Sequence, residues 1–226
     1  MIRDCRAAKA VAAALQSFAR RLSHIYFGRG LLTVSVTQSP ASKGQIKEEL
    51  LMELSIVIPT YNERDNVAVI ARRIQASLPA GTGYEILFVD DSSVDTPAIL
   101  EQLAREDGHV RWFHRHNRRG LALAVAEGIE VAEGEYIIVM DADLQHPPEI
   151  LPLIVERLRQ YDVVIPSRFI PGGSDGGLNG WRKLVSWVAR KLANLAIRRL
   201  RDISDCTSGY FGLRRAVVDH VRLEPV

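Results

Sequence analysis

Short apolar segments alternate with helix-patterned segments along residues 54–165. A brief apolar run rich in β-branched residues indicates a strand buried on both faces, and apolar residues every three or four positions indicate a helix with one buried side. This alternation predicts βαβ units, right-handed crossovers and a mostly parallel sheet flanked by helices. We expect strands at residues 54–58, 85–89, 110–113, 136–140 and 163–165, and helices at residues 65–78, 96–106, 119–132 and 148–160.

Polar clusters follow three of these strands, at residues 59–63, 90–93 and 141–145. In parallel sheets, ligands bind outside the carboxyl ends of the strands, so the clusters mark a candidate binding edge. A fold that needed only stability would not require all three. The sequence has no G-x-G-x-x-G after the first strand and no G-x-x-x-x-G-K, which excludes a dinucleotide fingerprint and a P-loop.

Asp141, Asp143 and Gln145 carry oxygen ligands directly after the fourth strand. If the chain stays extended there, side chains two positions apart share one face. Two carboxylates and a carboxamide suit Mg²⁺, whose shell is usually completed by substrate phosphates and water. The alternative is a polar turn before a helix that opens at Pro148. For a lone Asp-x-Asp, that turn is the more frequent outcome.

Composition sets broad limits. The 226 residues are 47% hydrophobic, enough for one good core, and the formal net charge is only +2. Cys5 and Cys206 lie far apart without metal-ligand spacing, which argues against a disulfide framework and fits a reducing compartment. No window reaches the roughly 18 consecutive apolar residues that a membrane span needs, so we expect that this chain alone does not cross a bilayer.

Residues 1–51 differ from the rest because basic residues far outnumber acidic ones around an alanine-rich stretch. Such a composition also occurs in transit peptides. We favour a poorly ordered basic extension, or a start codon assigned too early, because the first strand begins only after Met52. The expected organisation is this extension at 1–51 and one domain at 52–226.

Six motifs occur in order along the second region. They are residues 59–63 (Pro-Thr-Tyr-Asn-Glu), 89–93 (Val-Asp-Asp-Ser-Ser), 120–121 (Gly-Leu), 140–148 (Met-Asp-Ala-Asp-Leu-Gln-His-Pro-Pro), 167–169 (Ser-Arg-Phe) and 205–210 (Asp-Cys-Thr-Ser-Gly-Tyr). Together they resemble glycosyltransferase family 2, and within it the branch of dolichol-phosphate mannosyltransferases and other polyprenyl-phosphate glycosyltransferases. The resemblance implies a GT-A fold, a Rossmann-like nucleotide-sugar-binding architecture, over about residues 54–223.

The resemblance also implies roles for individual residues. Catalysis is expected to depend on Asp143, Arg168 and Asp205. The remaining implied contacts are Pro59, Tyr61, Glu63, Val89 and Asp91 around the nucleoside, Asp141, Ala142 and Asp143 at the diphosphate, Arg168 and Arg182 at the donor phosphates, and Asp143 and Gln145 on the metal, Mg²⁺ or Mn²⁺. Asp141 joins this metal set because it is a carboxylate directly after the fourth strand. A guanidinium suits the phosphate role because its fixed fork of donors matches phosphate oxygens.

The implied activity is inverting transfer of a hexose, mannose from GDP-mannose in the first instance, to a dolichyl or polyprenyl phosphate. We expect the chain to act peripherally at the cytoplasmic face of a membrane. Alternatives are a UDP-sugar-dependent transferase for glucose or N-acetylglucosamine, and a non-catalytic nucleotide-sugar-binding subunit. A phosphate acceptor is already mostly anionic at neutral pH and needs little general-base help. Asp205 either orients the acceptor or forms a structural turn.

The chain departs from the family pattern in two places. Residues 95–97 read Asp-Thr-Pro where the family commonly shows Asp-Gly-Thr. The sequence stops at Val226, before the point where the family supplies a further lysine and then membrane-associated helices. We therefore expect a domain truncated at its C-terminal end, which needs a membrane-spanning subunit or a further C-terminal domain as partner.

Two segments near the C-terminal end have alternative interpretations. The glycine-rich residues 169–180 suit either a mobile lid over the donor or a plain linker. Residues 182–201 are strongly basic with apolar residues at helical spacing, which predicts a helix on an anionic membrane surface or a core helix with a solvated face. No recognised motif supports nucleic-acid binding.

Overall fold

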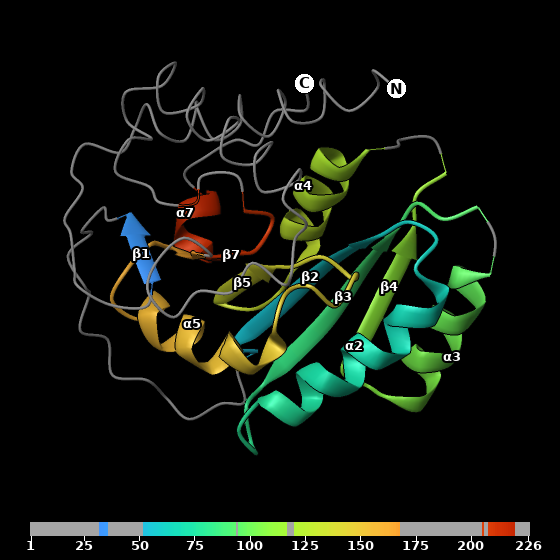
Figure 1. The fold of residues 1–226 in the computed structure, drawn as a ribbon, viewed down its shortest axis with the longest axis horizontal. Helices are drawn as coiled ribbons and strands as arrows, with labels where there is room; N and C mark the ends of the chain where they lie inside the picture. Colours follow the sequence, from blue (N-terminus) through green and yellow to red (C-terminus); the bar gives the residue numbers. More distant parts are fainter. Residues whose placement is uncertain are drawn as a thin grey trace, which may run out of the picture.

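The computed structural model describes residues 32–35 (as backbone), 52–93, 95–116, 120–167, 205 and 208–219. Their strands form one seven-stranded sheet in the order β1-β6-β7-β5-β2-β3-β4 (Figure 1). The strands are β1 (Leu32–Ser35), β2 (Leu54–Thr60), β3 (Tyr84–Asp90), β4 (Val110–His114), β5 (Tyr136–Val139), β6 (Val163–Pro166) and β7 (Phe211–Arg214). The helices are α2 (Arg64–Ser77), α3 (Thr96–Glu106), α4 (Leu121–Val131), the 3₁₀ turn η1 (Pro148–Ile150), α5 (Leu151–Leu158) and α7 (Arg215–Asp219).

The sheet is mostly parallel. Strand β2 pairs in parallel with β3 and β5, and β3 pairs in parallel with β4. Strand β7 is inserted antiparallel between β5 and β6, so β6 runs in the same direction as β5. Strand β1 pairs antiparallel with β6 at the edge. The α/β class expected from the alternating pattern is confirmed, whereas β7 and β1 were not expected from the sequence.

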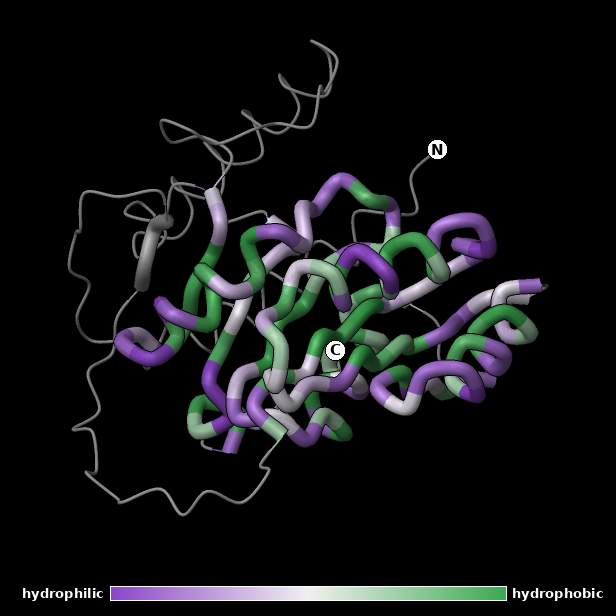
Figure 2. The backbone as a smooth tube through the Cα atoms, turned by 90° about the horizontal axis from the view of Figure 1, so that it is seen from below, coloured by the Kyte–Doolittle hydropathy of each residue, from purple (hydrophilic) through white to green (hydrophobic). Residues whose placement is uncertain are grey.

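Successive residues of the central strands enter two separate cores. Ile56 and Ile58 of β2 pack in the cluster beneath α2, α3 and α5, and Val57 between them packs in the cluster beneath α4. This follows from the period of two in a strand, where neighbouring side chains point to opposite faces. The helices in Figure 2 alternate between hydrophobic and hydrophilic stretches, as expected for elements with one buried side.

Helix α4 approaches the sheet closely at Gly128. A methyl group at this position would overlap Val57 Cγ1 and come within 2.9 Å of Val89 Cγ2. The absence of a side chain therefore lets the helix backbone lie directly on β2 and β3. Because α4 begins immediately after Gly120, this contact also fixes where the first turn of the helix meets the ends of the strands.

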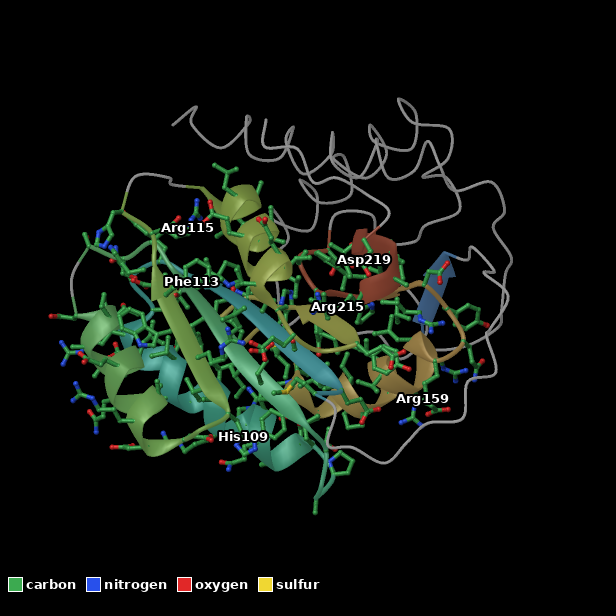
Figure 3. All side chains as sticks on the ribbon, turned by 180° about the vertical axis from the view of Figure 1, so that it is seen from behind. His109, Phe113, Arg115, Arg159, Arg215 and Asp219 are labelled. Carbon is green, nitrogen blue, oxygen red and sulfur yellow. The ribbon has the colours of Figure 1, made fainter. Side chains whose placement is uncertain are left out.

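The amino-terminal edge of the sheet is held by a buried polar network around Glu85, which is 1% exposed. Its Oε1 accepts hydrogen bonds from Ser55 Oγ at 2.5 Å and Glu133 N at 2.7 Å. Its Oε2 accepts one from Arg111 Nη1 at 2.6 Å. A buried carboxylate needs such partners, so the network ties β2, β3, β4 and the turn before β5 together. Figure 3 shows His109 and Arg115 at opposite ends of β4, near this edge and near the polar clusters, respectively.

Within the residues that the structure describes, no helix is both long and apolar enough to cross a bilayer. Most of residues 1–51 lie outside the described part, and the division into an extension and a domain stays a prediction. The described portion of that extension, Leu32–Ser35, forms the edge strand β1.

Candidate nucleotide-sugar site

The three polar clusters lie at neighbouring strand ends. Strands β5, β2 and β3 are adjacent in the sheet, and their parallel pairing brings their carboxyl ends to one edge. Thr60 at the end of β2 pairs with Asp90 at the end of β3. The prediction that the clusters meet at one edge is confirmed at the level of the backbone.

Asp90 is a structural hub of this edge and is fully buried. Its Oδ1 accepts hydrogen bonds from Thr60 Oγ1 at 3.1 Å and Ser92 Oγ at 2.6 Å. Its Oδ2 lies 2.7 Å from His114 Nδ1. These contacts fix the turn after β3 against the ends of β2 and β4. His114 is thus committed to Asp90, and its ring packs edge-on against His116 with centroids 4.7 Å apart.

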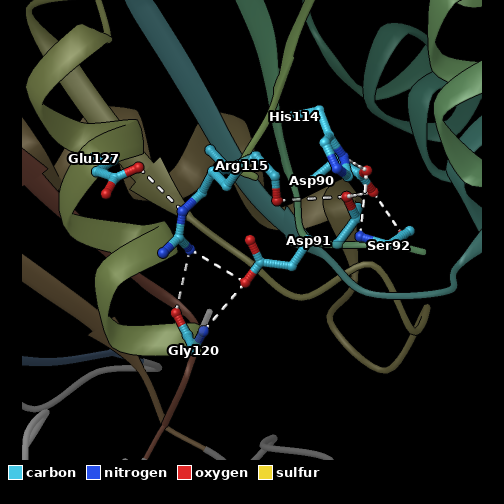
Figure 4. A network of polar contacts seen from close by, with 9 residues as sticks. Asp90, Asp91, Ser92, His114, Arg115, Gly120 and Glu127 are labelled. Atoms are coloured by element: carbon cyan, nitrogen blue, oxygen red, sulfur yellow. Dashed lines mark hydrogen bonds and ion pairs between the residues drawn. The ribbon is translucent and has the colours of Figure 1, made fainter. Parts of the chain in front are cut away.

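Asp91 lies in a second network, drawn in Figure 4. Its Oδ2 accepts hydrogen bonds from Arg115 Nη1 and Gly120 N, each at 3.2 Å. Arg115 Nη1 also donates to Gly120 O at 3.3 Å, and Arg115 Nε lies 3.0 Å from Glu127 Oε2 on α4. The side chain of Arg115 is 2% exposed and that of Asp91 is 10% exposed. Asp91 Oδ1 is buried and has no hydrogen-bond partner among the described residues.

The turn after β2 presents the other residues expected around a nucleoside. Tyr61 is 58% exposed, and the neighbouring Asn62 has a left-handed backbone whose N–H donates to Ser92 Oγ at 2.8 Å. Glu63 accepts a hydrogen bond from Asn66 Nδ2 at 2.6 Å. Pro59 is partly buried at the strand end. The side chain of Val89, by contrast, belongs to the core beneath α4, which leaves only its main chain at the edge.

The segment after β5 turns instead of continuing as an extended chain. The backbone bends at residues 142–144, and Leu144 has a φ of 62°. Asp143 Oδ1 accepts a hydrogen bond from Gln145 N at 3.1 Å, which closes the turn. Asp143 and Gln145 are exposed, the Asp141 side chain is 38% exposed, and Ala142 is buried. The condition of an extended chain is therefore not met, and the alternative of a polar turn is what the structure shows, with all three side chains on it.

The aromatic rings of His146 and Tyr210 hold this turn in place. His146 Nδ1 accepts the N–H of Asp141 at 3.1 Å and lies 3.7 Å from Asp141 Oδ2. The His146 ring stacks on Tyr210, whose hydroxyl donates to Pro147 O at 3.1 Å. Burial raises the pKa of Tyr210 far above its ordinary value, so the phenol stays protonated. Gly209 lies so close to Asp141 that an added Cβ would be 3.0 Å from Oδ2.

The remaining predicted residues are only partly described. Asp205 is fully buried, and its main-chain oxygen accepts a hydrogen bond from Ser208 N at 3.3 Å. This geometry is that of a turn before β7, and a role towards the acceptor stays a prediction. Arg168, Arg182, the glycine-rich segment and the basic segment at residues 182–201 lie outside the described residues.

The residues that the structure describes contain no cluster of three or more His, Cys, Asp or Glu side chains able to hold a metal ion. The predicted set at residues 141–145 has two carboxylates and one amide. Because Gln145 is not one of these four residue types, the set cannot form such a cluster. Its donor chemistry still fits Mg²⁺ or Mn²⁺, because such ions take few protein oxygens and complete their shell with phosphate and water.

Known proteins show where this arrangement belongs. The family model described as Glycosyl transferase family 2 matches residues 55–222. The chain belongs to glycosyl transferase family 2. Among curated relatives, a dolichol-phosphate mannosyltransferase of Pyrococcus furiosus is 40% identical over 176 residues, which are 77% of this chain and 50% of that protein. The dolichol-phosphate mannosyltransferase of Saccharomyces cerevisiae is 36% identical over 173 residues, 75% of this chain and 63% of the yeast protein.

A third relative carries a different sugar specificity in its name. The undecaprenyl-phosphate 4-deoxy-4-formamido-L-arabinose transferase of Pseudomonas aeruginosa is 38% identical over 172 residues, 74% of this chain and 48% of that protein. The family 2 chain thus spans about half to two thirds of the length of these relatives.

Solved structures support the fold. Glucosyl-3-phosphoglycerate synthase from Mycobacterium tuberculosis, crystallised with Mn²⁺, UDP and phosphoglyceric acid, matches with a TM-score of 0.55 at 19% identity, over 73% of this chain and 56% of the synthase. Mannosyl-3-phosphoglycerate synthase from Rubrobacter xylanophilus matches with a TM-score of 0.54 at 22% identity, over 73% and 53% of the two chains. The expected GT-A architecture is confirmed.

Sequence reasoning missed Arg115, Glu127 and the Asp90–His114 pair. A lone arginine or histidine after a strand is usually a solvated surface residue. The available signal was positional, since Arg115 directly follows β4 at the same edge as the three polar clusters.

Proposed function

We propose that this domain is the donor-binding and catalytic part of an inverting glycosyltransferase that moves a hexose, mannose from GDP-mannose, onto a dolichyl or polyprenyl phosphate. The observation that carries this proposal is the identity of 36% and 40% to two dolichol-phosphate mannosyltransferases. Those matches extend over about three quarters of this chain.

The edge of the sheet offers separate positions for the parts of a nucleotide sugar. Tyr61 is an exposed aromatic ring at the end of β2, suited to packing against a base or ribose. Asp91 is an acceptor for base or ribose donors at the end of β3. The turn at residues 141–145, after the adjacent β5, carries the carboxylates proposed for the diphosphate end. The order of these positions along the edge matches the order of groups in the donor.

In the proposed reaction, an oxygen of the acceptor phosphate attacks C1 of the sugar while the bond from C1 to the nucleoside diphosphate breaks. The acceptor oxygen is already anionic at neutral pH, so no side chain has to remove a proton. The leaving group carries the developing charge. Arg168 and Arg182 are proposed to stabilise that charge, which is the kind of preorganised electrostatic help that usually contributes most to the rate.

A divalent ion held by Asp141, Asp143 and Gln145 would supply further positive charge at the leaving diphosphate. The exposure of Asp143 and Gln145 supports the proposal, because both side chains can be reached by an ion and a ligand from solvent. Mg²⁺ or Mn²⁺ is the proposed cofactor, and the synthase from Mycobacterium tuberculosis that shares the fold was crystallised with Mn²⁺ and UDP.

A different donor is the second candidate. The relative from Pseudomonas aeruginosa transfers a modified arabinose to undecaprenyl phosphate at a similar level of identity, 38%. Polyprenyl phosphate is the feature that the names of all three relatives share, dolichol being a polyprenol, whereas the sugar differs. The acceptor class is therefore better supported than mannose or GDP.

We also propose that the domain acts at the cytoplasmic membrane face, as a peripheral protein or beside a membrane-spanning partner. The basic residues 182–201 would contribute to attachment, because each Lys or Arg near an anionic surface contributes about 1 kcal/mol at modest ionic strength. Co-sedimentation with vesicles that contain anionic lipid should fall as salt is raised. Attachment that ignores both salt and lipid charge would contradict this electrostatic role.

The donor is tested by thermal shifts of the full chain with GDP, UDP, GDP-mannose and UDP-glucose, each with Mn²⁺ and with EDTA. We expect the largest stabilisation with GDP-mannose and Mn²⁺, since ligands that bind only the folded state raise its stability. A larger shift with the uridine nucleotides would favour the second candidate. No shift with any nucleotide would contradict nucleotide-sugar binding altogether.

A further inference from the structure

We propose that Arg115 is a positioning residue that holds Asp91 by one oxygen and leaves the other to accept the ring N–H of a guanine or uracil base. The inference rests on the proposed function, because it needs a nucleotide at this edge. It concerns a residue that is neither in a polar cluster nor in a motif of the sequence.

The first observation is the asymmetry of the Asp91 carboxylate. Oδ2 has two donors, Arg115 Nη1 and Gly120 N, each at 3.2 Å. Oδ1 is buried without a partner among the described residues, and the side chain is nine-tenths buried. Buried carboxylate oxygens are nearly always hydrogen-bonded, so a buried acceptor left open at a ligand-binding edge calls for a donor from the ligand.

The second observation is that Arg115 is itself held in place. Its Nε lies 3.0 Å from Glu127 Oε2, and its Nη1 donates to Gly120 O at 3.3 Å. Gly120 has a φ of 130°, a conformation that side-chain-bearing residues rarely adopt. This conformation lets Gly120 offer its N–H to Asp91 and its oxygen to Arg115 together (Figure 4). The carboxylate is therefore fixed in rotation by two elements, the end of β4 and the start of α4.

With one carboxylate oxygen left as an acceptor, this geometry favours guanine and uracil over adenine and cytosine. Guanine carries N1–H and uracil carries N3–H on the edge used for base pairing, whereas adenine N1 and cytosine N3 at the matching positions are acceptors. A charged acceptor such as Asp91 Oδ1 favours the first pair and repels the second. By occupying Oδ2, Arg115 keeps that oxygen from competing for the base and leaves Oδ1 as the acceptor.

The test measures dissociation constants of GDP, N1-methyl-GDP, UDP and N3-methyl-UDP with the full chain. Methylation replaces the hydrogen of the ring N–H with a methyl group, so the position can no longer donate a hydrogen bond. For the nucleotide that the wild type binds, we expect methylation to weaken binding by about tenfold or more, as for loss of a hydrogen bond to a charged group. In Arg115→Gln this methylation ratio should fall towards one, and Arg115→Lys, which keeps the charge without the fork, should give an intermediate ratio.

Arg111→Gln is the matched control, because Arg111 lies on β4, which Arg115 directly follows, and pairs with buried Glu85 at the opposite end of the strands. It should lower stability without changing the methylation ratio. If Arg115→Gln does not fold, Glu127→Gln tests the same restraint and should lower the ratio by a smaller factor. A ratio in these variants equal to that of the wild type, or a wild-type ratio near one, would overturn the inference while nucleotide binding stands. Absence of binding by every unmethylated nucleotide would instead overturn the proposed function, and this inference with it.

Discussion

The ring of His146 stacks on the ring of Tyr210, with centroids 4.9 Å apart and planes inclined by 23°. His146 follows the turn at residues 141–145, and Tyr210 directly precedes β7. The stack therefore joins the turn proposed for the diphosphate to the segment that starts at Asp205. Together with the hydrogen bond from the Tyr210 hydroxyl to Pro147 O, the stack holds in place the residues that pack against Asp141.

Tyr210→Phe should destabilise the domain by about 1 kcal/mol near pH 8, because it removes a buried hydrogen bond. The pKa of Tyr210 in the folded chain lies above its ordinary value because of burial, whereas in the unfolded chain the phenol ionises near about pH 10. Above that pH the wild type loses stability by up to about 1.4 kcal/mol per pH unit from this group, and Tyr210→Phe does not.

The difference in unfolding free energy between the two proteins should therefore narrow as pH rises past 10. Urea titrations at pH 8 to 10.5 measure it. Tyr61→Phe removes the hydroxyl of an exposed tyrosine and is the control, with little effect expected at any pH. A difference that stays constant across this range would mean that the phenol is not held neutral by the fold.

The sequence predicted the elements that bury regular apolar patterns and missed those that depend on topology. The range of α3 was predicted without error, since Pro97 opens it and its apolar spacing is regular. Strand β7 is only four residues long and includes Gly212, so its sequence has little strand character. It becomes a strand because β5 and β6 offer free edges on both sides of it.

Side-chain positions in the candidate site also depend on topology and could be predicted only in part. Strand ends predicted which residues gather at one edge, but not how the side chains turn there. Leucine rarely adopts a left-handed backbone, so the bend at Leu144 was not foreseeable from its residue type. Arg115 was missed because its ion pair with Glu127 joins two residues that only the fold brings together.

Gly128→Ala should destabilise the domain by about 1–3 kcal/mol, the usual range for overpacking a core. Alanine is the better helix former by nearly 1 kcal/mol, so propensity alone predicts the opposite sign. The new methyl group would collide with the side chain of Val57, which is fully buried on β2. Chemical denaturation measures the change. Gly108→Ala is the control, because nothing lies within 4 Å of its added Cβ, and a near-zero effect there is expected. Stabilisation of the domain by Gly128→Ala would show that α4 is not seated this closely.

Glu149→Gln should cost only a few tenths of a kcal/mol, because the ion pair with Arg73 at 2.7 Å is largely exposed. Partial burial alone would raise the pKa of Glu149, but the hydrogen bond and charge of Arg73 hold it below its ordinary value. A lowered pKa contributes stability above the unfolded-state value, near pH 4.5, and that contribution disappears as pH falls through the folded-state value.

The small advantage of the wild type over Glu149→Gln should therefore be present at pH 7 and vanish in acid. Thermal unfolding at pH 7 and pH 3.5 compares the two. A gap that widens in acid would contradict the direction of the pKa shift.

Asp143→Ala should remove the effect of Mn²⁺ on nucleotide affinity and lower the thermal stability of the nucleotide-free protein only slightly. The side chain is exposed, and its only described contact is the hydrogen bond from Gln145 N. Affinities of the nucleotide with Mn²⁺ and with EDTA give the comparison. Glu156→Ala removes an exposed carboxylate on α5, away from the edge, and should keep the metal effect. Equal affinity of the wild type in Mn²⁺ and EDTA would sink the metal proposal.

Arg168→Ala should lower turnover more than Asp205→Asn, measured with polyprenyl phosphate and saturating donor. The reasoning is that charge on the leaving diphosphate limits the reaction and that the acceptor needs no base. Asp205 is fully buried, so circular dichroism of Asp205→Asn has to show a folded protein before its rate is interpreted. The reverse order of effects, with a single basic limb near about pH 7, would favour a hydroxyl acceptor.

The seating of α4 at Gly128 has a consequence for how binding preferences could change. Gly128 and Gly120 are eight residues apart, which is about 12 Å along a helix. The helix connects two contacts: Gly128 lies against β2 and β3, and Gly120, just before the first turn, donates its N–H to Asp91. A larger side chain at position 128 would tilt α4, displace Gly120 and so shift the Asp91 carboxylate, although position 128 contacts no ligand. Nucleotide preference could therefore change through substitutions at buried position 128. Mutant libraries restricted to residues that contact the ligand would not include this position.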